Sequence, residues 1–311
     1  MKILITGGGG YLGSYLINNL PNTYDIICLD HGKQYSQFNK LNNNITFIKG
    51  DITDSNLLEK IFMKKIDVII NCAGNAGNSV CMKDPVNSIF SHINGTKLLI
   101  QKSKKFKVKR FIHISSISVY SIIKKRKISI PEKTILEPDT FYGALKMLAE
   151  NYVQENYSNY VILRLANIYG KFRYTQNKSK FGVIEHFINA ALKKENITIY
   201  GSGKQKMEFI HIDDVFNCIL MIIKNPEIKN EIFNVGPGKL ISVAKIAKII
   251  SKSSKKVLKY EPEIKKLSNT SEKTYTKTHM SIHKIKQKIN WSPKISMING
   301  LELMLRSKEN D

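Results

Sequence analysis

The sequence has few of the features that mark membrane, secreted or metal-binding proteins. No apolar run approaches the length that crosses a membrane. The run Ile3–Ile5 is too short for a signal-peptide core and is soon followed by glycines. We therefore expect a cytoplasmic protein with no membrane partner. The four cysteines lack metal-type spacing and an obvious disulfide pattern, so no metal site is expected: Cys28, Cys72, Cys81 and Cys218.

Acidic residues are also scarce. The chain of 311 residues has 25 Asp and Glu against 49 Lys and Arg, a formal net charge of +24. Such a charge can attract nucleic acid, acidic lipid or an anionic small substrate. The lysines are scattered, however, and no nucleic-acid-binding module accompanies them, so we expect no nucleic-acid partner. The densest basic segments, Lys102–Arg110 and Lys124–Lys127, are expected to form solvated surface.

The first fourteen residues have the pattern of a strand, a glycine turn and a helix. Lys2–Thr6 suits a buried parallel strand, and Tyr11–Leu20 has helical apolar spacing. Gly7, Gly10 and Gly13 fit G-x-x-G-x-x-G, a variant of the dinucleotide fingerprint. They would allow, respectively, a tight turn, the approach of a pyrophosphate, and close packing of helix on strand. A flexible turn without a ligand is the alternative.

An acidic residue follows where the fingerprint expects one, about twenty residues further on. Asp30 closes the strand pattern Asp25–Leu29. Its carboxylate would accept hydrogen bonds from the adenosine ribose and repel the extra phosphate of NADP. The sequence therefore favours NAD, while Lys33 leaves NADP open and a plain turn aspartate is the alternative. The positive end of the first helix, at Tyr11 and Leu12, would face the cofactor phosphates.

Strand and helix patterns alternate through the first 165 residues. Further strands are predicted at Ile45–Lys49, Asp67–Asn71, Arg110–Ser115 and Val161–Leu165. Further helices are predicted at Ser55–Phe62, Pro85–Lys102 and Tyr142–Tyr157. This alternation predicts an α/β fold, a Rossmann-type doubly wound parallel sheet.

Beyond Gly170 the elements become shorter and less regular. The predicted elements include a strand at Ile197–Tyr200, a helix at Ser242–Ser251 and a last helix at Ile282–Ile289. We expect residues 1–166, with a return segment near 205–238, to form the NAD-binding domain. Residues 167–204 and 239–311 are expected to form a smaller C-terminal lobe that binds the substrate.

Tyr142 and Lys146 lie four residues apart on a predicted helix and therefore share a face. A nearby ammonium favours the phenolate, so it lowers the pKa of a tyrosine from about 10. Such a pair can move a proton to or from a substrate hydroxyl. Ser116 comes just after a predicted strand, at the sheet edge where ligands bind, and could bond the same oxygen. Ser115 or Ser118 could do so instead, and two surface residues of an amphipathic helix remain the alternative for the pair.

The order of these motifs resembles the extended short-chain dehydrogenase/reductases of the NAD-dependent epimerase/dehydratase family, in particular the UDP-glucose 4-epimerase-like sugar-nucleotide enzymes. The resemblance covers nearly the whole chain. It rests on TGGGGYLGS, GDI, SSISVY, YGALK, LRLANIYG, YGSGKQKMEFIHIDDV and NWSPKISMINGLELML.

The resemblance implies a role for each matching residue. Ser116, Tyr142 and Lys146 would form the catalytic set, with Lys146 also binding the nicotinamide ribose. Asp51 and Ile52 would flank the adenine. The middle of the cofactor would lie against Cys72, Ala73 and Gly74. Asn167 would contact the sugar nucleotide, and a homodimer would form through the helices Pro85–Lys102 and Tyr142–Tyr157.

The sequence departs from the family pattern at several positions. His92 replaces the usual asparagine, and Met207 replaces an arginine before the acidic-Phe-Ile pair. A second phosphate-binding arginine, expected near Ser271, is also missing. Four lysines could replace the arginines, as point charges without the bidentate fork: Lys204, Lys206, Lys273 and Lys277.

The predicted activity is that of an NAD-dependent nucleotide-sugar epimerase, an isomerase of carbohydrate biosynthesis. Ile117 and Ser118 stand where 4,6-dehydratases carry an acidic pair, which argues against elimination chemistry. The alternatives are a reductase of nucleotide keto-sugars and a catalytically inactive cofactor-binding relative. The sequence names neither the sugar nor the nucleotide.

Overall fold

The computed structural model describes residues 1–32, 44–120, 129–171, 182–267 and 278–307. The chain divides into two compact units. Unit 1 comprises Met1–Ser121, Glu132–Leu165 and Cys218–Asn234. Unit 2 comprises Ile122–Pro131, Ala166–Asn217 and Val235–Asp311. Several residues of the sequence analysis lie outside the described residues: Lys33, Lys124–Lys127, Lys273 and Lys277.

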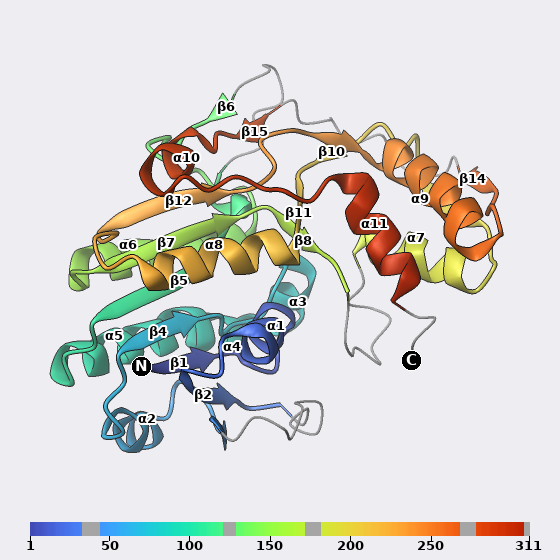
Figure 1. Ribbon diagram of the computed structural model, residues 1–311. Helices are drawn as coiled ribbons and strands as arrows, with labels where there is room; N and C mark the ends of the chain where they lie inside the picture. Colours follow the sequence, from blue (N-terminus) through green and yellow to red (C-terminus); the bar gives the residue numbers. More distant parts are fainter. Residues whose placement is uncertain (33–43, 121–128, 172–181, 268–277, 308–311) are drawn as a thin grey trace. The chain divides into compact units, whose positions relative to one another are not determined.

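Unit 1 is built, in its described part, on a seven-stranded sheet of order β12-β7-β5-β4-β1-β2-β3 (Figure 1). The strands are β1 (Lys2–Thr6), β2 (Asp25–Asp30), β3 (Ile45–Lys49), β4 (Val68–Asn71), β5 (Arg110–Ser116), β7 (Tyr160–Leu165) and β12 (Glu231–Val235). All the pairs from β3 across to β7 are parallel. The order runs outward in both directions from β1, which confirms the predicted doubly wound sheet.

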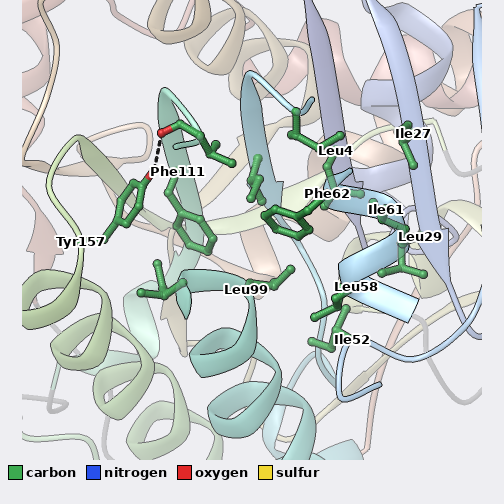
Figure 2. Close-up of a cluster of buried hydrophobic side chains, with 14 of the residues drawn as sticks. Leu4, Ile27, Leu29, Ile52, Leu58, Ile61, Phe62, Leu99, Phe111 and Tyr157 are labelled. Atoms are coloured by element: carbon green, nitrogen blue, oxygen red, sulfur yellow. Dashed lines mark hydrogen bonds between the residues drawn. The ribbon is translucent and has the colours of Figure 1, made fainter. Parts of the chain in front are cut away.

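One face of this sheet is covered by α2 (Ser55–Phe62), α5 (Thr96–Lys105) and α6 (Phe141–Asn156). Their apolar side chains and those of the strands form one buried cluster. Figure 2 shows Phe62, Leu99 and Phe111 at its centre. At its edge the Tyr157 hydroxyl donates a hydrogen bond to the Val108 carbonyl. Asp54 accepts bonds from two N–H groups in the first turn of α2 and so caps it as predicted.

Arg110 corrects one prediction from the basic composition. We expected the segment Lys102–Arg110 to be solvated, but Arg110 is only 5% exposed. Its guanidinium donates to the carbonyl oxygens of Ile222, Asn225 and Pro226, at 2.5, 2.8 and 2.8 Å. These carbonyls lie in the last turn of α8 (Ile212–Lys224) and just after it, where a helix leaves acceptors without partners. The sequence shows the charge but not these acceptors.

The predicted helix Pro85–Lys102 is not one continuous α-helix. It consists of α4 (Pro85–Ile89), the π-helical segment η2 (Phe90–Gly95) and α5. Apolar spacing does not separate a π turn from an α turn, so the sequence could not indicate the change. The remaining elements of unit 1 are α1 (Tyr11–Asn19), α3 (Asn78–Lys83) and the 3-10 turn η3 (Ile117–Val119).

Unit 2 has short two-stranded pairs and a helical core. Its strands are β6 (Ser129–Ile130), β8 (Asn167–Tyr169), β9 (Ile197–Tyr200), β10 (Lys206–Met207), β11 (Phe209–His211), β13 (Ile241–Ser242), β14 (Ile264–Leu267) and β15 (His279–Met280). The pairs are β8 with β11, β9 with β14, β6 with β15, and β10 with β13. The core lies among three helices: α7 (Val183–Leu192), α9 (Val243–Leu258) and α11 (Met297–Arg306).

The C-terminal end of unit 2 corrects a second prediction. The helix α10 (His283–Ile289) was predicted as the last, but α11 follows it. Ser296 begins α11 by accepting a hydrogen bond from the Asn299 N–H at 3.2 Å. None of the helices in the described ranges is both long and apolar enough to cross a membrane.

Candidate active site

The glycine turn between β1 and α1 brings three backbone segments of unit 1 close together. Gly7 has φ of +67°, and a Cβ there would lie 2.8 Å from the Ala73 backbone. A Cβ on Gly13 would lie 2.3 Å from the Gly7 oxygen, so α1 could not pack as closely on β1. Gly10 differs, because a Cβ there would meet only the Gly7 oxygen within 4 Å. Among the described residues, little therefore crowds the position outside Gly10.

This turn fits the phosphates of a dinucleotide. Gly10 precedes α1 and provides no side-chain cap for the first N–H groups of the helix. Tyr11 and Leu12, predicted as cofactor contacts, open the helix there, and the Leu12 side chain is buried. A helix N-terminus next to open space is suited to an anion, because its N–H groups and dipole both favour negative charge.

Asp30 lies at the carboxyl end of β2, beside this turn. Its two carboxylate oxygens accept hydrogen bonds from the backbone N–H groups of Gly9 and Gly32, at 2.9 and 2.7 Å. These bonds fix the carboxylate against the glycine turn. A carboxylate held there can still accept bonds from ribose hydroxyls through its remaining lone pairs.

We predict that the fixed Asp30 carboxylate makes the protein bind NAD at least ~10-fold more tightly than NADP, because it would face a phosphate of like charge. Asp30→Ser should reduce this preference. Isothermal titration of both oxidised cofactors into the two proteins measures it. Equal or tighter binding of NADP by the unaltered protein would contradict the assignment.

The remaining residues predicted to contact the cofactor follow two other strands. Cys72, Ala73 and Gly74 come directly after β4, at the edge where β1 leads into the glycine turn. Asp51 and Ile52 follow β3, and the Asp51 carboxylate accepts from the Thr53 N–H and hydroxyl, both at 2.8 Å. The Ile52 side chain is buried in the core, so an adenine would meet mainly its backbone.

Ser116, Tyr142 and Lys146 come together in unit 1, as the motif spacing predicted. The Ser116 side chain lies near enough to the Tyr142 phenol to lower the pKa of that phenol. The Lys146 ammonium lies 5.9 Å from the centre of the Tyr142 ring and donates to the Ile114 carbonyl at 2.8 Å. Lys146 is buried, whereas Ser116 and Tyr142 are partly exposed. The phenol and the hydroxyl can therefore act on one substrate oxygen, and the buried ammonium can act on the phenol through its charge.

Sequence reasoning missed Gly143, which allows this arrangement. A Cβ on Gly143 would lie 2.1 Å from the Ser118 carbonyl oxygen, so α6 begins directly against η3. Thr140 caps the helix by accepting from the Gly143 N–H at 3.1 Å. The signal was present in the sequence as a glycine in the first turn of a helix rich in good helix formers.

The ionisation of the pair differs from the prediction. Burial raises the pKa of Tyr142 to about 12, and the nearby Ser116 side chain only partly offsets this. Burial lowers the pKa of Lys146 to about 8, and the neighbouring Cys72, Cys81 and Glu150 only partly offset this. The expected lowering of the tyrosine pKa by the lysine is therefore wrong for the protein without cofactor, because desolvation of the phenol dominates.

The structure also separates the three serines of SSISVY. The Ser115 hydroxyl donates to the buried carboxylate of Glu150, so it is committed to the protein interior. Ser116 and Ser118 face each other, with 3.2 Å between their hydroxyl oxygens. Ser116 is therefore the serine of this segment that lies against Tyr142.

His92, one of the departures from the family pattern, lies on η2 and packs edge-on against Tyr142, with 5.9 Å between ring centres. Its Nε2 is 3.0 Å from the Asn75 carbonyl, which can only accept, so Nε2 carries the proton. Burial and the Lys146 charge lower its pKa to about 3. The imidazole therefore stays neutral and ties the segment after β4 to η2.

Apart from Ser116, which lies in unit 1, the residues predicted to bind substrate lie in unit 2. Asn167 begins β8, and its side-chain amide donates to the Glu208 carbonyl at 2.9 Å. Lys204 follows the Gly201–Gly203 turn, and Lys206 begins β10; both side chains are exposed. Met207, in place of the family arginine, is also exposed.

Sequence comparison identifies the relatives of this chain. Residues 3–236 match the family described as NAD dependent epimerase/dehydratase. A putative UDP-glucose 4-epimerase of Methanocaldococcus jannaschii is 30% identical over 317 residues, which span 99% of both chains. A dTDP-D-glucose 4,6-dehydratase of Dictyostelium discoideum is 35% identical over 271 residues, which span 80% of this chain but only 61% of that relative.

Solved structures have the same fold along the whole chain. A UDP-glucose 4-epimerase from Thermotoga maritima, solved with UDP-glucose, matches with a TM-score of 0.85 and 28% identity, covering 100% of this chain and 99% of that one. A UDP-glucuronic acid 4-epimerase from Bacillus cereus, solved with UDP-glucuronic acid and NAD, matches with a TM-score of 0.81 and 26% identity, covering all of both chains. The chain therefore belongs to the NAD-dependent epimerase/dehydratase family, and NAD is its cofactor.

Proposed function

We propose that this protein is a nucleotide-sugar epimerase that inverts one carbon of the sugar. The observation that carries the proposal is that Tyr142 and Lys146 lie near Ser116, while the two positions after Ser116 hold no acidic side chain. Relatives named as epimerases span nearly the whole chain, which supports the same choice. The glycine turn, Asp30 and Lys146 would hold the cofactor.

In this mechanism the protein residues move one proton and hold one oxygen. Tyr142, in its phenolate form, takes the proton from the sugar hydroxyl and later returns it to the same oxygen. Ser116 bonds that oxygen and orients it towards the phenol. The Lys146 ammonium favours this phenolate form, because its positive charge lies near the phenol. NAD, when bound, supplies the hydride chemistry at the sugar carbon.

The absence of acids beside Ser116 separates this proposal from the dehydratase activity that some relatives are named for. Elimination of water from a sugar needs a further acid and base beside the keto-forming carbon. Ile117 carries no proton-transfer group, and the Ser118 hydroxyl lies against Ser116. Neither side chain can supply a carboxyl group.

A reductase would use the same catalytic set but would consume one reduced cofactor per product. An epimerase leaves the cofactor unchanged after each turnover, whereas an inactive relative would form no product. Incubation with a panel of nucleotide sugars, with nicotinamide absorbance and product both followed, separates the three. Net formation or loss of reduced cofactor would exclude the epimerase.

We predict that two exposed lysines of unit 2 bind the substrate diphosphate. Lys204→Ala and Lys206→Ala should each raise KM about 10-fold and leave kcat nearly unchanged, because a charge-assisted contact contributes roughly 1.5 kcal/mol equally to substrate and transition state. Lys248→Ala, at an exposed lysine of α9, is the control. Steady-state kinetics measures the effect, and unchanged KM in both variants would place the diphosphate elsewhere.

We further propose a homodimer through the α3–α6 face of unit 1. Five large apolar side chains of this face are 43–61% exposed: Met82, Val86, Ile89, Phe90 and Leu148. Such clustered exposure marks an interaction surface. Leu148→Glu should therefore give monomers by analytical ultracentrifugation. Leu303→Glu, at an equally exposed leucine (50%) of α11, should leave dimers. A monomeric unaltered protein would refute the dimer.

A further inference from the structure

A buried polar cluster lies behind the catalytic residues of unit 1. Glu150 on α6 and Arg164 on β7 are 0% and 2% exposed. The Arg164 Nε lies 3.1 and 3.0 Å from the two carboxylate oxygens, and its Nη2 lies 2.7 Å from Oε2. Ser115 donates to the same carboxylate, and Arg164 donates to the Tyr120 hydroxyl at 2.7 Å. We call Ser115, Glu150 and Arg164 the carboxylate clamp.

The carboxylate clamp joins the two segments that carry the catalytic groups. Ser115 immediately precedes Ser116 on β5. Glu150 lies about one turn after Lys146 on α6. Arg164 is the direct register partner of Ser115 on the neighbouring strand β7. The Glu150 carboxylate belongs to α6, the helix that carries Tyr142 and Lys146. It is bonded to Ser115, at the end of β5 that carries Ser116.

Stability of the fold alone does not explain the buried ion pair of Glu150 and Arg164. Desolvation of two buried charges offsets most of their attraction, so apolar residues of similar volume would stabilise the fold equally well. Apolar side chains would not, however, fix the helix against the strand in one register. Directional bonds to both carboxylate oxygens do so, because they tolerate little displacement.

Building on the proposed catalytic set, we propose that Glu150 is a positioning residue: held by Arg164 and Ser115, it fixes Lys146 and Tyr142 of α6 relative to Ser116 of β5. Its carboxylate also acts on Lys146 through its charge. The titratable groups that face Lys146 come from every element packed around it: Tyr142 and Glu150 of α6, Cys72 after β4, Cys81 of α3, His92 of η2 and His113 of β5.

The first experiment removes the hydrogen bond from Ser115 to Glu150 and keeps the charges of Glu150 and Arg164. Ser115→Ala should lower kcat about 10-fold, with KM and NAD affinity within twofold of the unaltered protein. Ser115→Thr keeps a hydroxyl and should restore most of kcat. The control is Arg110→Met, which removes a buried arginine at the other end of β5. It should lower Tm but leave kcat unchanged well below Tm.

The second experiment reads Lys146 without any sugar substrate, so it stands even if the proposed reaction is wrong. NAD affinity, measured by titration between pH 6.5 and 9.5, should fall as the ammonium loses its proton. In Glu150→Gln this fall should begin at a lower pH, because the negative charge that favours the ammonium is gone. Arg110→Met should leave the profile unchanged.

Two results would overturn the proposal. One is a kcat in Ser115→Ala equal to that of the unaltered protein. The other is a pH profile of NAD affinity that is the same in Glu150→Gln as in the unaltered protein. If Glu150→Gln does not fold, Ser115→Ala and Ser115→Thr decide the matter alone. If the unaltered protein converts no nucleotide sugar, the proposed function fails and the NAD profile still decides the role of Glu150.

Discussion

Tyr142→Phe should lower turnover by ~10²–10⁴, the range expected for loss of a general acid–base group. The substitution removes the phenol oxygen that lies near Ser116 and leaves the ring that packs against His92. NAD should remain bound with nearly unchanged affinity, because the glycine turn, Asp30 and Lys146 are untouched. Steady-state kinetics and cofactor titration on the purified variant measure both effects.

A second tyrosine associated with the same helix provides the control. Tyr157 follows α6, is buried, and donates its hydroxyl to the Val108 carbonyl (Figure 2). Tyr157→Phe should cost stability, because it leaves a buried acceptor without its donor, but it should keep turnover. Near-normal turnover in Tyr142→Phe would mean that another group moves the proton.

Lys146→Met should abolish most turnover and weaken NAD binding by ~10–100-fold, because one charge-assisted contact contributes roughly 1.5–3 kcal/mol. This separates it from Tyr142→Phe, which should lose turnover alone. Lys146 is 4% exposed and its ammonium bonds the Ile114 carbonyl, so methionine would fill much of the same volume without the charge. Ser116→Ala should have an intermediate effect on turnover, since Tyr142 can still reach the oxygen.

Lys146→Met should also change how the free energy of unfolding depends on pH. Burial lowers the pKa of Lys146 to about 8 from 10.5 in the unfolded chain, so at pH 7 the folded protein carries the full cost of a buried ammonium. Between these two values the unfolded state binds more protons, so the stability of the unaltered protein rises with pH. Lys146→Met lacks this gain.

The difference in unfolding free energy between the unaltered protein and Lys146→Met should therefore shift by about 2 kcal/mol in favour of the unaltered protein from pH 7 to pH 9.5. Urea unfolding at the two pH values measures it. Lys248→Met, at a lysine that is solvated in both states, is the matched control and should show no such shift. A constant difference for Lys146→Met would mean that the ammonium is solvated in the folded protein.

Local patterns were sufficient to predict most of unit 1. β1, β3 and α2 have the bounds that the apolar runs and the Asp54 cap indicate. Tyr142 and Lys146 could be placed together because i,i+4 spacing on a helix is a local property. Ser116 could be added because the carboxyl ends of parallel strands share one edge of the sheet.

Features that depend on neighbours distant in sequence could not be predicted. The burial of Arg110 depends on carbonyls more than a hundred residues away. The pKa of Tyr142 depends on how much protein covers the phenol, and the spacing to Lys146 carries no such information. The short strand pairs of unit 2, such as β10 with β13, have too few residues for a periodic pattern.

The most direct test of the proposed epimerase is the product formed from nucleotide sugars. The NAD-loaded protein is incubated with a panel of such compounds, and proton NMR follows the sugar signals, with Tyr142→Phe as the inactive control. We expect at least one substrate to give an equilibrium mixture with its epimer at a single carbon, without net change in reduced cofactor. A 4-keto-6-deoxy sugar as the product, or stoichiometric consumption of reduced cofactor, would contradict it.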